Sequence, residues 1–215
     1  AHLEHFGDIN EVAKTKSSLF SSLGKEDAAF INMDDPFISN MSIACKGVEY
    51  SFTKSSDYQG SWSSDRQTLT INNISINLST ASGAIGLNAL AVFSIASYFG
   101  MDAYVIKNQI ESFQLPAGRG NILQFQDIMV INDSYNANLE SARTGINNLT
   151  SLSKGSRKIA VIGDMLELGD LEEDHHKTLG KYLSENKVDA VFAFGDLTRH
   201  TIKAMNGAAI FHQYY

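Results

Sequence analysis

The spacing of hydrophobic residues changes along this chain and divides it into two parts. In residues 8–113 the apolar positions first recur at helical spacing, then alternate as in β-strands, and then fill two further helical segments. From residue 128 onward, short apolar runs alternate with helical segments. This alternation is typical of strand–helix–strand units with a parallel sheet. The whole pattern predicts an α/β fold.

The pattern also gives residue ranges for the elements. In the first part we expect helices at 8–23, 83–99 and 104–113, a strand at 28–33, and β-structure over 42–78 with a hairpin turn at Asn72-Asn73. The helix at 83–99 is apolar almost throughout, so we expect it to be buried. In the second part we expect strands at 128–131, 158–162, 189–194 and 208–211, and helices at 139–152, 172–185 and 198–205.

A hinge is expected between the two parts. Residues 114–120 hold one of the two prolines of the chain, two glycines and Arg119 between segments of different pattern. We therefore predict one domain over residues 1–114 and a second over 115–215.

Composition narrows the class of protein. The hydrophobic content of 43% is typical of a compact globular protein, and the net charge of −7 argues against a nucleic-acid partner. The single Cys45 excludes an internal disulfide and fits a reducing compartment. No apolar stretch reaches the roughly 18–20 residues of a membrane helix. We expect a soluble, cytoplasmic monomer that does not insert into a membrane.

Two polar stretches carry the candidate chemistry. Val130-Ile-Asn-Asp-Ser-Tyr-Asn-Ala-Asn138 and Val161-Ile-Gly-Asp-Met-Leu-Glu-Leu-Gly169 each begin as an apolar strand and end in polar or small residues. In α/β folds, ligands bind at the carboxyl ends of such strands. A carboxylate, a phenol and several amides close together indicate a binding site, although Asn138 is also well placed to cap the helix that follows.

These motifs, together with four others in the same order, resemble the Mur ligase family. The other four are Ala1-His-Leu-Glu-His-Phe-Gly7, Ile31-Asn-Met-Asp-Asp-Pro36, Asn88-Ala-Leu-Ala91 and Leu115-Pro-Ala-Gly-Arg119. The resemblance spans nearly the whole chain. It implies the latter part of a central ATPase domain at 1–114, followed by a Rossmann-like C-terminal ligase domain with a mostly parallel sheet, itself cut short at its end.

The resemblance also implies an activity. Within the family, the two polar signatures are similar to those of the ligase that joins D-alanyl-D-alanine to UDP-N-acetylmuramoyl-tripeptide in peptidoglycan precursor synthesis. That reaction uses ATP and Mg²⁺ and passes through an acyl phosphate. The sequence has no Gly-x-x-x-x-Gly-Lys-Ser/Thr phosphate loop. We therefore expect a fragment that is inactive alone, and the alternative is a non-catalytic module that binds nucleotide or dipeptide.

Residue roles follow from the resemblance position by position. It implies that Arg119 contacts phosphate and Asp133 contacts ribose, and these two are the expected catalytic residues. A planar guanidinium fork suits phosphate oxygens. The expected cofactor-binding residues are Asn88, Arg119, Asp133, Tyr135, Asn136 and Asn138.

Three assignments remain open at this point. His2 is implied as a magnesium ligand, although imidazole is an unusual partner for this ion and a plain loop histidine is the alternative. Asn88 is implied as a nucleotide contact, and the alternative is a polar residue near a helix start whose amide the backbone satisfies. Asn88 also departs from its family context, because Ile85 stands where many relatives have a second asparagine. For Asp164, Glu167 and His176 of the second signature, a substrate-side role and a structural turn are equally open.

Overall fold

The computed structural model describes residues 9–80, 82–206 and 209–213. The chain forms two compact units, one over Phe6–Gln114 and a second that begins at Leu115. Each unit has its own hydrophobic core.

The first unit contains a five-stranded mixed sheet in the order β1-β2-β3-β4-β5. Its strands are β1 (Ala28–Asn32), β2 (Lys46–Ser51), β3 (Tyr58–Ser63), β4 (Thr68–Ile71) and β5 (Ile74–Asn77). The first three strands are parallel, and β3, β4 and β5 pair antiparallel. The expected hairpin at Asn72-Asn73 is confirmed, since both residues have a positive φ and join β4 to β5. The sequence did not resolve β3 as a separate strand.

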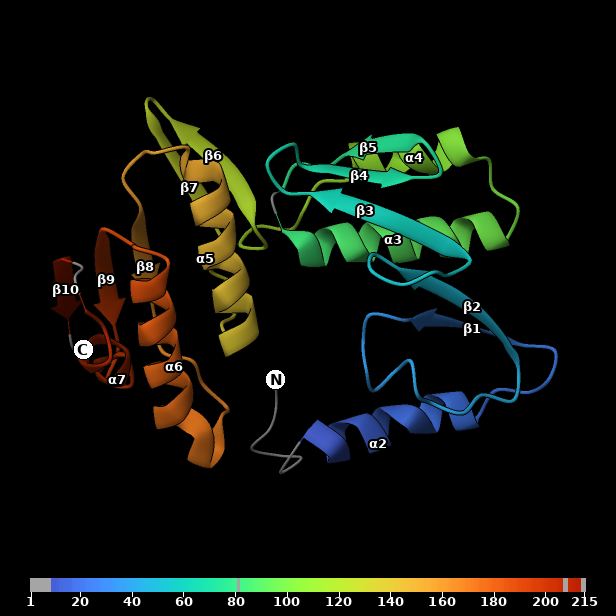
Figure 1. Cartoon of the computed structure of the whole chain (residues 1–215), viewed down its shortest axis with the longest axis horizontal. Helices are drawn as coiled ribbons and strands as arrows, with labels where there is room; N and C mark the ends of the chain where they lie inside the picture. Colours follow the sequence, from blue (N-terminus) through green and yellow to red (C-terminus); the bar gives the residue numbers. More distant parts are fainter. Residues whose placement is uncertain (1–8, 81, 207–208, 214–215) are drawn as a thin grey trace. The chain divides into compact units, whose positions relative to one another are not determined.

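The described residues of this unit form the helices α2 (Ile9–Ser21), α3 (Gly83–Tyr98) and α4 (Ala103–Ser112) (Figure 1). Only one face of α3 is buried, through Leu90, Phe93 and their neighbours, so the expectation of a buried helix was wrong. Its other face exposes Val92 and Ile95, and Phe99 just beyond the helix is 75% exposed. A helix that is apolar all round carries no periodic signal of which face will be covered.

Gly86 lets α3 approach the sheet closely. A Cβ atom at this position would lie 2.7 Å from the indole ring of Trp62 on β3. Gly86 therefore has a packing role.

The second unit contains a parallel sheet and a separate hairpin. The parallel sheet has the order β10-β9-β8, from β8 (Ile159–Ile162), β9 (Ala190–Phe194) and β10 (Ala209–Gln213). The helices are α5 (Leu139–Ser153), α6 (Glu172–Glu185) and α7 (Thr198–Lys203), with a short 3₁₀ turn η1 at Gly169–Leu171. The core lies among α5, α6, α7 and the sheet.

The strand expected at 128–131 forms, as β7 (Ile128–Asn132), but in a different partnership from the one predicted. It pairs antiparallel with β6 (Asn121–Phe125), a strand that the sequence did not reveal. The two strands are joined by Gln126 and Asp127, and Gln126 takes a positive φ of 53° without being glycine. Because the turn lacks the usual Asn-Gly or Asp-Gly signal, the hairpin was missed. The predicted α/β class with a mostly parallel sheet is confirmed.

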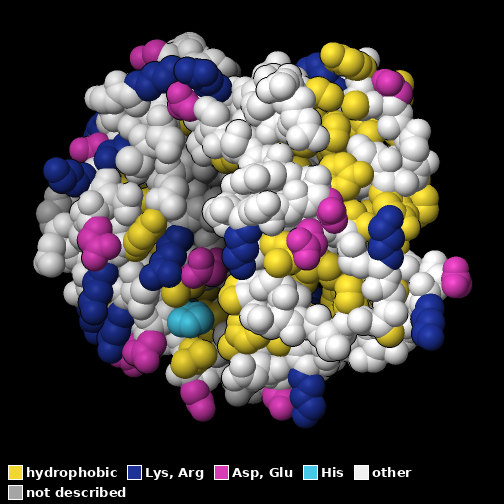
Figure 2. Space-filling model, turned by 45° about the vertical axis from the view of Figure 1, so that its right-hand side comes forward, with side chains coloured by type: hydrophobic (Ala, Val, Ile, Leu, Met, Phe, Trp, Pro, Cys, Tyr) yellow, Lys and Arg dark blue, Asp and Glu magenta, His cyan; other side chains and the backbone are white. Residues whose placement is uncertain are grey.

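The surface is mixed in charge. On the face that Figure 2 presents, Lys and Arg side chains alternate with Asp and Glu, and hydrophobic side chains form patches between them. Within the described ranges, none of the helices is long and apolar enough to cross a membrane.

Candidate functional site

The predicted site residues fall into three groups. Arg119, Asp133, Tyr135, Asn136 and Asn138 all lie in the second unit, on the turn before β6 and the loop after β7. Asn88 lies on α3 of the first unit. His2 lies outside the described residues.

Backbone hydrogen bonds fasten the turn before β6 to the loop after β7. The amide of Gly120 donates to the carbonyl of Asn132 at 2.9 Å, and the amide of Tyr135 donates to the carbonyl of Gly118 at 3.1 Å. The side chain of Asn121 donates to the carbonyl of Leu115 at 3.1 Å and closes the turn. These bonds hold the motif 115–119 next to the motif 130–138.

Gly118 is required for this contact. Its φ is +79°, and a Cβ atom built there would lie 3.0 Å from the backbone nitrogen of Tyr135. Another residue would meet both a strained backbone and a crowded neighbour.

The turn places the Arg119 guanidinium over the Tyr135 ring, with 3.8 Å between the guanidinium carbon and the ring centroid. The stack orders a cation on the surface, since the Tyr135 residue is itself 66% exposed. The two residues belong to different signatures and together form one positively charged platform.

Asp133 lies beside this platform. Crowding by protein atoms raises the pKa of its carboxyl above 3.8, and the charge of Arg119 acts in the opposite direction. The residue as a whole is still exposed. A carboxylate that is accessible, partly desolvated and close to an arginine is suited to accept hydrogen bonds from ligand hydroxyls.

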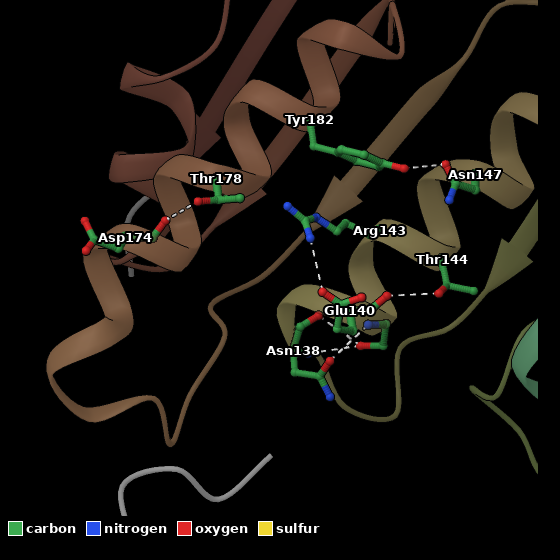
Figure 3. A network of polar contacts seen from close by, with 9 residues as sticks. Asn138, Glu140, Arg143, Thr144, Asn147, Asp174, Thr178 and Tyr182 are labelled. Atoms are coloured by element: carbon green, nitrogen blue, oxygen red, sulfur yellow. Dashed lines mark hydrogen bonds and ion pairs between the residues drawn. The ribbon is translucent and has the colours of Figure 1, made fainter. Parts of the chain in front are cut away.

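The two asparagines of the loop already use their oxygens within the chain. Asn136 accepts a hydrogen bond from the amide of Ala137 at 2.8 Å. Asn138 caps α5. Its side-chain Oδ1 accepts a hydrogen bond from the backbone N–H of Ser141, and its backbone N–H donates to the Ser141 hydroxyl. Figure 3 shows this cap at the start of the polar contacts that run along α5. The predicted capping role of Asn138 is confirmed, and its ligand role stays a prediction.

Asn88 is exposed on α3, and none of the described residues forms a hydrogen bond with its side chain. The alternative, in which the backbone satisfies this amide, is therefore not what the structure has. The geometry leaves the amide accessible to a ligand.

The second signature is largely occupied by internal contacts. Asp164 accepts a hydrogen bond from the amide of Thr198 at the start of α7, at 2.9 Å. Its carboxylate fits against Gly195, where a Cβ atom would come within 2.4 Å of it. Glu167 points outward with a positive φ of 60°. Asp164 therefore has a structural contact and Glu167 is exposed, and a substrate-side role of either residue stays a prediction.

Comparison with known proteins decides the family. The family described as "Mur ligase middle domain" matches residues 1–96, and "Mur ligase, glutamate ligase domain" matches residues 118–214. The chain belongs to the Mur ligase family. A UDP-N-acetylmuramoyl-tripeptide–D-alanyl-D-alanine ligase from Bacillus subtilis is 30% identical over 204 residues, covering 92% of this chain and 44% of the relative. The enzyme of the same name from Escherichia coli is 26% identical, over 96% of this chain and 48% of the relative.

Solved structures of Mur ligases share the fold. MurF from Acinetobacter baumannii superposes with a TM-score of 0.84 at 24% identity, covering 99% of this chain and 48% of that one. MurF ligase from Thermotoga maritima, in complex with ADP, superposes with a TM-score of 0.79 at 22% identity, over 100% of this chain and 50% of that one. The chain spans about half the length of the curated relatives it matches.

The candidate site holds two features that the sequence did not reveal. The first is the stack of Arg119 on Tyr135, and the second is the role of Asn121 in closing the turn. An asparagine directly after Arg-Gly is a turn signal that would have indicated the second. The first depends on the contact between the turn before β6 and the loop after β7, which the local sequence pattern does not reveal.

Metal binding is not explained by the described part of this Mur ligase chain. Within it, no group of three or more His, Cys, Asp and Glu side chains lies close enough to hold a metal ion. The positive charge of Arg119 acts on Asp133, and a nearby positive charge disfavours binding of a cation there.

Proposed function

We propose that this chain is part of an ATP-dependent ligase that joins D-alanyl-D-alanine to UDP-N-acetylmuramoyl-tripeptide in peptidoglycan precursor synthesis. In this proposal residues 1–114 belong to the central ATPase domain and residues 115–215 to the C-terminal ligase domain. The curated relatives that match nine-tenths of the chain bear the name of this ligase, which supports the assignment.

The observation that carries the proposal is the Arg119 platform. Two motifs, which resemble this family, are fastened so that a guanidinium lies over a phenol ring beside a partly desolvated carboxylate. A fixed cation binds phosphate oxygens, and a nearby carboxylate accepts hydrogen bonds from ribose hydroxyls.

The chemistry explains why ATP is needed. A carboxylate is a poor electrophile, so an oxygen of the tripeptide carboxylate attacks the γ-phosphorus of ATP and ADP leaves. The free amine of the dipeptide, its ammonium having lost a proton, then attacks the acyl carbon. The carbon–oxygen bond to phosphate breaks, and phosphate leaves with the electron pair as the amide nitrogen loses its second proton. Positioning and charge stabilisation are what a protein supplies to such steps.

The residues of the chain take the following roles in the proposal. Arg119 balances charge on phosphate oxygens, and Tyr135 holds its guanidinium in place. Asp133 accepts hydrogen bonds from ribose hydroxyls. The nucleotide contact that the resemblance implies for Asn88 is a separate prediction. The amide nitrogens of Asn136 and Asn138 are the groups left for donation, since their oxygens are engaged.

Magnesium and the cellular location complete the proposal. Mg²⁺ assists phosphoryl transfer by neutralising charge on the phosphates. In the proposal, residues outside the described ranges, His2 among them, contribute to holding it. A cytoplasmic location is supported by the single, unpaired Cys45.

The test measures ADP formation that depends on added D-alanyl-D-alanine, with ATP, Mg²⁺ and UDP-N-acetylmuramoyl-tripeptide present. A full-length protein that carries this chain is expected to form ADP and the amide product in equal amounts. The 215-residue chain alone is expected to form neither, because its sequence has no phosphate loop.

Two results would contradict the proposal. Turnover by the chain alone would refute the expectation of an inactive fragment. A full-length protein that lacks dipeptide-dependent turnover but binds ADP or the dipeptide with a Kd of about 1 μM or below would favour the binding module instead.

A further inference from the structure

His176 is the most completely enclosed polar residue of the second signature. It lies on α6 with a fully buried side chain. The backbone amide of Met165, in the turn after β8, donates a hydrogen bond to its Nε2 at 3.1 Å. Its Nδ1 lies 2.9 Å from the hydroxyl oxygen of Thr201 on α7. One imidazole therefore joins the signature turn to two helices.

These contacts define the state of the ring. A backbone N–H can only donate, so Nε2 must be the unprotonated nitrogen. Nδ1 then carries the proton and donates it to the Thr201 hydroxyl. The ring is neutral in this arrangement. A protonated ring would set an N–H at Nε2 against the N–H of Met165, and the bond would be lost.

The turn Gly163–Leu168 has buried or hydrogen-bonded residues on either side of two exposed ones. The side chains of Met165 and Leu168 are buried, and Asp164 is fixed to the amide of Thr198. Leu166 and Glu167, between the buried anchors, point outward. The Met165 amide directly precedes these two exposed residues in the chain.

We infer that His176 is a positioning residue of the proposed ligase reaction: in its neutral form it holds the turn Gly163–Leu168 through the Met165 amide and fixes how Leu166 and Glu167 are presented to the substrates. This inference rests on the proposed function. It assigns His176 a role through Met165, without any contact between the imidazole and a substrate.

The surroundings of the ring favour the neutral form at pH 7. Burial lowers the pKa of His176 below 6.5, and the charges of His200 on α7 and His175 on α6 act in the same direction. The negative charge of Asp164 in the turn acts in the opposite direction. The unfolded chain binds the proton more readily than the folded chain. Above pH 6.5 the histidine is neutral in both states, so it does not lower the free energy of unfolding. Stability declines as the pH falls from about 6.5 towards the folded-state pKa.

Two substitutions at one position separate the hydrogen bond from the titration. In H176Q, the Gln Oε1 reaches the place of Nε2 and accepts from Met165 at any pH. In H176L, a side chain of similar volume leaves the Met165 amide without an acceptor. The Thr201→Val variant removes only the partner of Nδ1 and serves as a second, milder change.

The first measurement is hydrogen exchange of the Met165 amide in the 215-residue chain, as a protection factor from pH 8 to pH 5. In the unchanged chain the protection is expected to fall roughly five- to tenfold towards pH 5. In H176Q it should stay constant, and in H176L it should be low throughout. The Val191 amide in the core strand β9 is the control for folding and should remain protected in each variant. Equal protection of Met165 in H176L and the unchanged chain would overturn the inference.

The second measurement is the pH profile of kcat/KM for D-alanyl-D-alanine in a full-length protein that carries this chain. Protonation of the dipeptide amine lowers kcat/KM at acid pH in every variant. In the unchanged protein we expect an additional loss below about pH 6.5 that is absent in H176Q, and in H176L a lower kcat/KM at every pH. Turnover with the same pH profile in all three proteins would overturn this inference alone. Absence of turnover in the unchanged protein would overturn the proposed function, and the positioning role of His176 with it.

Discussion

At the scale of single residues, two aspartates respond to the fold in opposite ways. Asp34 accepts hydrogen bonds from the hydroxyls of Ser51 and Thr53 and from the amides of Phe52 and Thr53, which hold its pKa below 3.8 although burial acts against them. Among the described residues Asp133 has no such set of donors, and crowding raises its pKa above 3.8. One carboxylate is structural, and the other is available to a ligand.

The Asp133 titration gives the first prediction. Its ionised form is disfavoured by folding, so this residue lowers stability as the pH rises through 3.8 to its folded-state pKa, whereas Asp34 contributes stability that is lost as the pH falls below 3.8. Arg119→Gln removes the opposing charge and should raise the Asp133 pKa further. Carboxyl ¹³C NMR titration of the 215-residue chain measures both residues, and Asp34 is the internal control that should not move. A midpoint for Asp133 below 3.8, or one unchanged in R119Q, would be inconsistent with this account.

Among elements, the close approach of α3 to β3 gives the second prediction. Gly86→Ala drives a methyl group to 2.7 Å from the Trp62 ring, so we expect a loss of about 1–3 kcal/mol of unfolding free energy. Gly83→Ala is the matched control on the same helix. Its Cβ would lie 3.5 Å from Trp62, an ordinary contact, and should leave stability unchanged or raise it slightly. Urea unfolding of both variants makes the comparison, and equal stabilities would contradict it.

The third prediction separates the two roles of Asn138. Serine is also a good N-cap, so Asn138→Ser should stay within about 0.5 kcal/mol of the unchanged chain, while Asn138→Ala should lose about 1 kcal/mol. Both variants remove the amide that is proposed to contact a ligand. If nucleotide or dipeptide binding by the full-length protein weakens equally in both, the amide acts on the ligand directly. If only the alanine variant is affected, the residue acts as a cap alone.

The elements show where sequence reasoning works. Helices with polar and apolar faces, such as α5 and α6, and strands bounded by turn residues were predicted to within a few residues. The hairpin of β6 and β7 was missed because its turn has no glycine, and the exposed face of α3 was missed because the helix is apolar all round. Local periodicity reveals neither a turn that lacks glycine nor which face of a uniformly apolar helix will be covered.

The candidate site shows the same division. The sequence predicted Arg119, Asp133 and Tyr135 individually, and the resemblance implied most of their roles. The stack of Arg119 on Tyr135 depends on backbone bonds between two separate loops. The structural role of Asp164 depends likewise on Gly195 and Thr198 of another strand and helix. The Asn88 and His2 assignments remain predictions from the resemblance.

At the scale of the whole molecule, the two units have separate cores. The first is built around Leu69, Ile71 and Leu90, and the second around Leu179, Leu183 and Val191. A unit with its own core can fold by itself when no part of that core is supplied by the other unit. The hinge at the boundary then serves as a connection, and neither core depends on it.

The last prediction follows from these separate cores. Residues 6–114 and 115–215, expressed as two pieces, should each show a cooperative urea transition, with a midpoint close to one of the transitions of the whole chain. A control cut after Ser94 divides α3 and separates Leu90 and Phe93 from Ile106 and Ile110 of the same core. Because that cut breaks one core between two pieces, the N-terminal piece of the control should lose its cooperative transition. If the pieces divided after residue 114 were also unfolded, each core would require contacts from the other unit, and the predicted domain division would be wrong.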